Sequence, residues 1–141
     1  MKIVFGFLLT FFLVTSVDGL AQCDADAHAS ACIPKLSKGF IFLKSYAVDS
    51  EDGDRTRVEY SYVFSKGRQY QINLCTGKPD DADGMVINVY DGQRKPVGSS
   101  KQGGKYLTGI QFACRSTGIY YIQYVFENPA LGCAGSALGF Q

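Results

Sequence analysis

Apolar and polar side chains alternate over several short segments of this sequence, and this alternation limits the fold more than any other feature. It is clearest over 55–65 (RTRVEYSYVFS), where Val58, Tyr60, Tyr62 and Phe64 alternate with polar residues. A period of two places every second side chain on the same face of a β-strand. We therefore expect a half-buried strand here, with these four residues facing the core.

Further segments with strand character follow, separated by turns rich in Gly, Asp, Asn and Pro. They comprise 39–48, 69–75, 85–90, 94–100, 106–115, 119–127 and 133–140. Segment 119–127 is aromatic and β-branched nearly throughout, which predicts a central strand covered on both faces. The turn Lys66-Gly67-Arg68 predicts a hairpin between 55–65 and 69–75, and Asp91-Gly92 predicts a second hairpin. Segment 101–105 (KQGGK) is expected to be exposed and flexible.

The length of 141 residues suits one domain, and 46% apolar with 19% charged residues is the composition of a globular chain. About eight short strands in succession are typical of an all-β fold. We expect a single β-sandwich or jelly roll over 39–141, stabilised by disulfides and preceded by a short N-terminal helical segment over 22–38.

The first 21 residues have the pattern of a secretory signal peptide. Lys2 precedes an almost purely apolar run, and Gly19-Leu20-Ala21 places small residues for cleavage before Gln22. The alternatives are an uncleaved anchor and a lipoprotein, because Leu20-Ala21-Gln22-Cys23 resembles a lipobox apart from the large Gln22. The prediction is an exported protein of the periplasm, outer-membrane surface or medium, with no transmembrane segment after cleavage.

Five cysteines lie in the exported part: Cys23, Cys32, Cys75, Cys114 and Cys133. An oxidising compartment makes disulfides the expected state. Asp24–Cys32 (DADAHASAC) has the composition of a short helix with an Asp N-cap. Such a helix would hold Cys23 and Cys32 about 13 Å apart, too far for a bridge. One of them is therefore expected to pair with Cys133.

The single pair expected among the remaining cysteines is Cys75–Cys114. The alternation opposes it, because Cys75 shares the parity of polar residues and Cys114 that of apolar ones. The pair thus needs a strand end that curls. The fifth cysteine is expected to be buried, paired between chains or, at Cys23, lipidated.

Part of the chain, from about 55 to 127, resembles the bacterial pre-peptidase C-terminal domain. The matching stretches are Tyr62–Phe64, Gly67, Tyr70–Leu74, Ile87–Asp91 with Gly92, and Thr117–Ile122 (TGIYYI). The chain also resembles small exported bacterial proteins. The resemblance implies a β-sandwich module that accompanies secreted enzymes and carries no catalytic residues of its own. Gly118-Ile119-Tyr120 also has the pattern of a tyrosine corner, in which a phenol ties a loop to the sheet.

Three aspartates, Asp80, Asp81 and Asp83, precede Gly84 and form the one candidate metal site. Clustered carboxylates are the ligands that calcium prefers. The spacing departs from an EF-hand, because the positions for its first and last ligands hold Pro79 and Tyr90. A solvated acidic loop is the simpler reading, so no cofactor is expected and calcium is the alternative.

Few residues could support catalysis. The only histidine, His28, lies in the predicted helix, and no Ser occurs in a Gly-x-Ser-x-Gly motif. Glu59 and Glu127 are the only acidic residues within predicted strands. The chain is therefore not expected to be an enzyme.

The remaining class of function is binding. A formal net charge of +1 argues against nucleic acid, and nine Tyr could form an exposed aromatic strip. The absence of Trp favours a protein partner over sugar. We expect a non-enzymatic binding or accessory module of the bacterial envelope or secreted fraction that binds another protein. A carbohydrate- or calcium-binding module is the alternative, and a small hydrolase or inhibitor ranks third.

Overall fold

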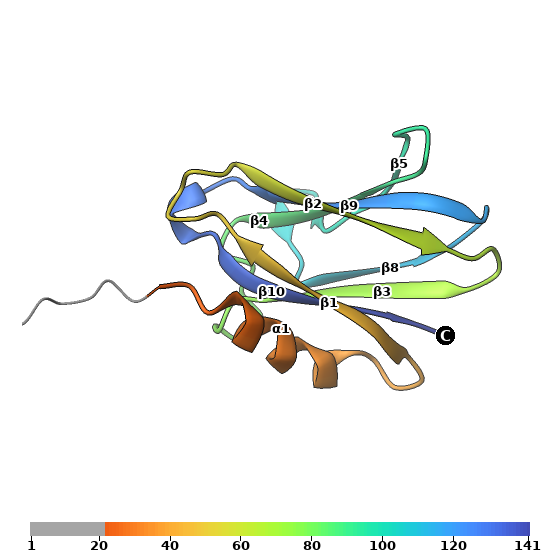
Figure 1. The fold of residues 1–141 in the computed structure, drawn as a ribbon, viewed down its shortest axis with the longest axis horizontal. Helices are drawn as coiled ribbons and strands as arrows, with labels where there is room; N and C mark the ends of the chain where they lie inside the picture. Colours follow the sequence, from red (N-terminus) through yellow and green to blue (C-terminus); the bar gives the residue numbers. More distant parts are fainter. Residues whose placement is uncertain (1–21) are drawn as a thin grey trace, which may run out of the picture.

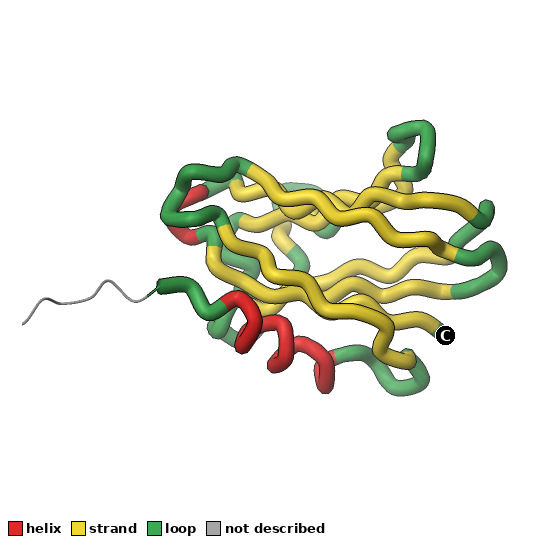
Figure 2. The backbone as a smooth tube through the Cα atoms, viewed as in Figure 1, coloured by secondary structure: helices red, strands yellow, loops and turns green. Residues whose placement is uncertain are grey.

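Two four-stranded antiparallel sheets pack face to face in the computed structural model, which describes residues 22–141 (Figures 1 and 2). The predicted signal peptide, 1–21, lies outside the described residues. The first sheet has the order β1 (Ile41–Asp49), β10 (Cys133–Phe140), β3 (Gln69–Cys75), β8 (Gly109–Ala113). The second has the order β2 (Arg57–Phe64), β9 (Gly118–Phe126), β4 (Met85–Tyr90), β5 (Pro96–Ser99). The predicted all-β sandwich is confirmed.

The strand pairing is that of a jelly roll. Counting only the strands of the two large sheets, the first pairs with the last (β1 with β10), the second with the seventh (β2 with β9), the third with the sixth (β3 with β8) and the fourth with the fifth (β4 with β5). This is one long hairpin wound around itself, and apart from β4 and β5, which pair in the second sheet, its successive strands alternate between the two sheets. Within residues 22–141, no helix is long and apolar enough to span a membrane.

The predicted core faces point inward. The core contains Phe64 from β2, three residues of β3 and Ile110 from β8, and Val58, Tyr60 and Tyr62 pack against it half-buried. The expectation for 119–127 is half right. β9 is central, between β2 and β4, but only every second residue is buried. The outer side chains of β9 are partly exposed because no other element of the described chain covers this face of the sheet.

The predicted hairpin between 55–65 and 69–75 is wrong. β2 and β3 lie in different sheets, and the turn between them crosses the sandwich. Both strands have one apolar face, and each buries that face against the opposite sheet. The predicted hairpin at Asp91-Gly92 is confirmed by the antiparallel pairing of β4 and β5.

Segment 101–105 also differs from the expectation of a flexible stretch. It belongs to a small hairpin of β6 (Lys101–Gln102) and β7 (Lys105–Tyr106). Two bonds attach this hairpin to β4, because the Ser100 backbone N–H donates to the Ile87 carbonyl (2.8 Å) and the Ile87 N–H donates to the Ser100 hydroxyl (2.7 Å). The sequence gives no sign of these contacts with a distant strand.

Helix α1 (Ala25–Cys32) covers the outer face of the first sheet, and Figure 1 shows it lying along β10 and β1. The Asp24 side chain accepts from the Ala27 backbone N–H at 3.1 Å, as predicted for the N-cap. The helix approaches β10 closely, since a Cβ built on Gly135 would lie 1.9 Å from the Ala29 nitrogen. A short 3-10 turn, η1 (Ile33–Lys35), continues the chain towards β1, and a second, η2 (Pro129–Leu131), precedes β10.

Two disulfides attach the N-terminal segment to the sandwich: Cys23–Cys133 and Cys32–Cys75. The bridge to Cys133 agrees with the expectation for one of the two N-terminal cysteines. The expected Cys75–Cys114 pair is wrong. Cys75 lies on the outer face of β3 beneath the helix, whereas Cys114 is buried as a free thiol among core residues. The alternation of polar and apolar residues, which opposed this pair, correctly indicated that the two cysteines lie on different faces.

The disulfide at Cys23 also bears on the lipoprotein alternative. A lipidated cysteine carries its lipid on the same sulfur that here bonds Cys133. The structure therefore favours a chain without lipid at Cys23. Disulfides form in oxidising compartments, so the two bridges also indicate a protein that folds outside the cytoplasm.

Candidate functional site

Among residues 22–141, no helix covers the outer face of the second sheet, in contrast to the first sheet (Figure 1). The strand register places its outward side chains in rows: Val63 opposite Ile119, and Tyr121 between Ser61 and Tyr90. Val63 is 58% exposed and Ile119 is 52% exposed. We call this surface the open face and define it by Val63, Ile119, Tyr121 and Tyr90. A shallow hollow of about 350 Å³ adjoins it, lined by Asn88, Tyr90 and residues of β5.

Arg94 is fixed across the centre of the open face. Its guanidinium carbon lies 3.7 Å from the centre of the Tyr121 ring, and Nη1 donates to Glu59 Oε2 at 2.8 Å. Gln123 donates to the same Glu59 oxygen at 3.2 Å. The hydrogen bond from Arg94 lowers the pKa of Glu59, so this carboxylate stays ionised. The result is a flat, pre-positioned group of one aromatic ring, one cation and one anion.

Arg94 was not predicted as a site residue. It comes from the turn between β4 and β5, whereas Tyr121 and Glu59 lie on β9 and β2. Only the sheet order brings the three together, and local sequence carries no signal for it. The composition of 119–127 predicted a strand covered on both faces, so the position of Tyr121 on the outer face was not predicted either.

The three aspartates of the predicted metal site lie in the β3–β4 loop but bond to their own surroundings. Asp81 Oδ1 accepts from the Asp83 N–H at 2.8 Å, and Asp83 Oδ1 lies 3.0 Å from Lys78 Nζ. Asp80 is exposed. Across residues 22–141, no three or more His, Cys, Asp or Glu side chains come together as a metal-binding group. The carboxylates of Asp81 and Asp83 are thus engaged in bonds within their own loop.

Each residue considered for catalysis forms contacts with other residues of the fold. Glu59 is paired as described, and Glu127 accepts from Lys101 Nζ at 2.8 Å and from the Tyr106 hydroxyl. The Lys101 hydrogen bond lowers the pKa of Glu127, which is the opposite of what a general acid needs. His28 packs against Gly77, where an added Cβ would lie 2.8 Å from its ring.

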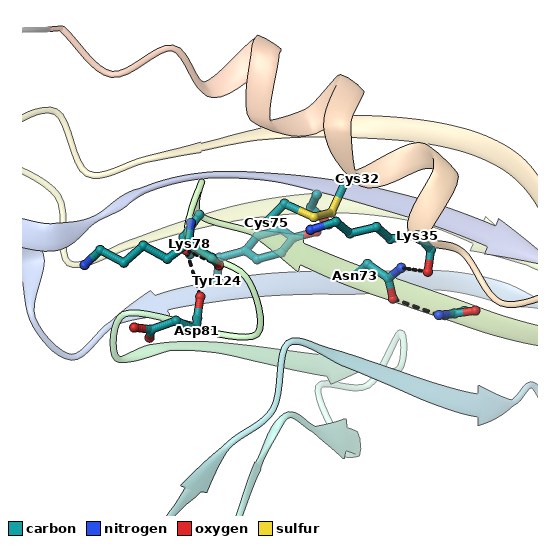
Figure 3. The surroundings of a disulfide bond; sticks show 10 residues. Cys32, Lys35, Asn73, Cys75, Lys78, Asp81 and Tyr124 are labelled. Carbon is teal, nitrogen blue, oxygen red and sulfur yellow. Dashed lines mark hydrogen bonds between the residues drawn. A yellow bond between two sulfur atoms is a disulfide. The ribbon is translucent and has the colours of Figure 1, made fainter.

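A polar groove of about 440 Å³ runs beside the Cys32–Cys75 disulfide, between η1 and the outer faces of β3 and β8 (Figure 3). Its floor contains the buried amides of Gln71 and Asn73. Asn73 donates to the Lys35 carbonyl at 2.9 Å and accepts from Gln71 Nε2 at 2.8 Å, while Gln71 Oε1 accepts from the Ser37 N–H. These amides use their bonds to hold the N-terminal segment on the sheet. We therefore assign the groove a structural role.

Tyrosines other than those of the open face act mainly in packing. Tyr46, Tyr70, Tyr120 and Tyr124 are buried. The Tyr120 hydroxyl donates to the Ser116 carbonyl at 2.6 Å and so ties the β8–β9 turn to the sheet, as the tyrosine-corner pattern predicted. These rings form no exposed strip.

Comparison with known proteins shows a distant structural similarity and no match in sequence. No protein-family model matches the chain, and no curated protein matches it. The resemblance to the pre-peptidase C-terminal domain is therefore not supported. Among solved structures, the chain is similar to the crystal structure of Aeromonas hydrophila PliG, a periplasmic lysozyme inhibitor of g-type lysozyme. The TM-score is 0.45 at 19% identity, over 74% of this chain and 90% of that one. At this distance the similarity assigns no function to the chain.

Proposed function

We propose that this protein is an exported, non-enzymatic module that binds another protein of the envelope or secreted fraction through the open face. One observation carries the proposal: an uncovered sheet face presents exposed apolar residues around a fixed Arg94–Tyr121 stack. Tyr and Arg are the residues that most often supply binding energy at protein interfaces, and a pre-positioned pair loses little entropy on binding.

The carbohydrate alternative has less support. A sugar ring stacks on the free face of an aromatic side chain. Here Arg94 covers one face of Tyr121 at 3.7 Å, and Tyr90 is half-buried. An apolar and charged surface of this kind is better suited to the side chains of a partner protein.

The proposal is tested by capture followed by affinity measurement. The purified protein captures partners from the envelope and secreted fractions of its own host, and each identified partner is then titrated against purified variants. A g-type lysozyme is included, because it is the target named for PliG. Replacing Tyr121 by Ala is expected to weaken binding by about thirtyfold, the effect of removing a central interface residue.

The matched control is Tyr106→Ala, which removes an exposed tyrosine outside the open face. It should leave the affinity unchanged. A partner bound equally well by the Tyr121→Ala and wild-type proteins would show that the open face is not the binding surface. Binding of envelope polysaccharide that is lost in Tyr121→Ala would instead establish the carbohydrate alternative.

A further inference from the structure

The two ends of the sandwich carry opposite charge, although the whole chain has a formal net charge of only +1. The connections between strands fall at two ends because the sheets are antiparallel. One end holds the start of α1 and the loops 49–56 and 76–84, which contain most of the acidic residues. The other end, on the right in Figure 1, holds the connections that contain Lys38, Lys66, Arg68, Arg94, Lys95 and Arg115. We call this second end the basic end.

Hydrogen bonds join the β2–β3 connection to the β8–β9 connection and to Gln141. The Gly67 N–H donates to the Cys114 carbonyl at 3.0 Å, and the Lys66 N–H donates to Thr117 Oγ1 at 2.9 Å. Gln69 and Gln141 exchange backbone bonds beside them. Lys66, Arg68 and Arg115 therefore project from connections that are bonded to each other.

Most of this positive charge is not neutralised within the described chain. Five exposed basic residues at this end form no ion pair with any residue of 22–141: Lys38, Lys66, Arg68, Lys95 and Arg115. Asp91 is the only acidic side chain in these connections, and its carboxylate accepts from the N–H groups of Gln93 and Lys95. The surface remains strongly positive.

Exposed apolar side chains gather at the same end. Ile41, Val63 and Ile119 have the largest exposed fractions of the large apolar residues described, at 61%, 58% and 52%. Phe42 adjoins Ile41 and is 40% exposed. The Arg68 guanidinium lies 5.6 Å from the Phe140 ring beside a hollow of about 270 Å³ that Leu43 and Val63 also line.

We infer that the basic end is a docking surface for a bilayer rich in anionic phospholipids. Lys and Arg attract the phosphates of the headgroups, and neighbouring apolar side chains enter the boundary between headgroups and acyl chains. Long basic side chains can extend around Ile41 and Phe42 to reach the phosphates. The apolar residues lie among the basic ones and do not form the single central pocket typical of a protein interface. The positive charge of the surface is complementary to the negative charge of the bilayer.

This inference goes beyond the proposed function and does not depend on it. A partner on the open face would contact one side of the molecule, while the bilayer contacts one end. Val63 and Ile119 lie where the two surfaces meet, and neither test alters them.

Co-sedimentation with vesicles tests the inference. The full chain is expressed with its own leader and purified after export. It is expected to bind vesicles of phosphatidylcholine mixed with phosphatidylglycerol, and to bind pure phosphatidylcholine vesicles far more weakly. Each basic residue near an anionic surface contributes roughly a fivefold factor to binding. Lys66→Glu/Arg115→Glu is therefore expected to weaken binding by at least about twentyfold.

The control, Arg55→Glu/Lys105→Glu, changes the net charge equally but outside the basic end. It should bind vesicles as the wild type does. Ile41→Ser/Phe42→Ser should weaken binding without altering its dependence on salt, since it removes only the apolar contribution. Equal losses in the control and the Lys66/Arg115 variant would overturn the inference, as would equal binding to neutral vesicles. So would binding to soluble polyglutamate without binding to vesicles, which would indicate an acidic protein as the occupant.

Discussion

Buried hydroxyl groups show most directly how single residues stabilise this sandwich. Tyr124, on β9, and Ser136, on β10, face each other across the core, and the Tyr124 hydroxyl donates to Ser136 Oγ at 2.5 Å. Both residues have no exposed surface. The bond therefore joins the two sheets, and each hydroxyl depends on the other for its partner.

Replacing Tyr124 by Phe should destabilise the protein by about 1–2 kcal/mol, because the Ser136 hydroxyl remains buried without its donor. The double variant Tyr124→Phe/Ser136→Ala should cost less than the two single variants summed, since it leaves no unpaired hydroxyl. Urea unfolding of all four proteins measures the difference. Strict additivity would show that the two groups do not interact.

The lowered pKa of Glu59 predicts that the stability of the protein depends on pH. Its pKa in the folded protein is lowered, first by the hydrogen bond from Arg94. Its stabilising contribution is therefore fully present above the pKa of the unfolded state, near 4.5, and is lost as the pH falls through the lower folded value. Because the pair is at the surface, the loss should be below about 1 kcal/mol.

The measurement is the free energy of unfolding between about pH 7 and pH 3. Glu59→Gln should show a shallower decline than the wild type, with part of the slope retained because Glu127 behaves similarly. Arg94→Gln should show the same reduction, since it removes the same bond from the other side. An unchanged slope in both variants would contradict the pairing.

At the scale of elements, the close packing of α1 against β10 depends on small residues. β10 presents Gly135, Ala137 and Gly139 towards the N-terminal segment, and a Cβ on Gly139 would lie 2.9 Å from Leu36 Cδ1. The helix can approach the sheet only because these side chains are small or absent. The same strand contributes Ala134 and Leu138 to the core, so both of its faces are covered.

Gly135→Ala should therefore destabilise the protein by about 3 kcal/mol or more, because its methyl group would overlap the backbone of Ala29 and displace the helix. The matched control is Gly118→Ala on β9, where nothing lies within 4 Å of an added Cβ. That change should stay within about 0.5 kcal/mol. Comparable losses in urea unfolding of the two variants would show that the helix does not pack as closely as described.

At the scale of the whole molecule, the disulfides connect the N-terminal segment to the middle of the chain at Cys75 and to its C-terminal part at Cys133. Cys32–Cys75 spans 43 residues and Cys23–Cys133 spans 110. Closing a loop of 43 residues restricts the unfolded chain by about 4 kcal/mol in the chain-entropy account. The helical segment and the sandwich should therefore unfold together.

Cys32→Ala/Cys75→Ala is expected to lower the free energy of unfolding by about that amount, about 4 kcal/mol, with Cys114→Ala as the control that removes a thiol without removing a bridge. Thiol labelling tests the pairing independently. The wild type should react with a thiol reagent only after denaturation, and peptide mapping should locate the label at Cys114. A label at Cys32 in place of Cys114 would contradict the Cys32–Cys75 bridge and support the rejected Cys75–Cys114 bridge.

Several features were determined by local sequence alone. The period of two in β2 and β3 fixed which residues face the core, since a strand alternates its side chains whatever lies around it. Asp24 fixed the start of the helix through a bond within four residues. Segments 69–75, 85–90 and 133–140 match their strands at both ends, because turn residues interrupt the pattern there.

Only the tertiary structure decided which strands pair and which side chains from distant segments come into contact. Nothing local distinguishes a hairpin from a turn that crosses the sandwich, so β2 and β3 were wrongly paired. Three contacts join residues far apart in the sequence: the packing of α1 on β10, the bridge from Cys32 to Cys75 and the stack of Arg94 on Tyr121. The separation of charge between the two ends is likewise absent from the composition, because a net charge of +1 records the sum and not the arrangement. Local sequence sets the conformation of each strand, and the order of strands in the jelly roll sets which surfaces they build.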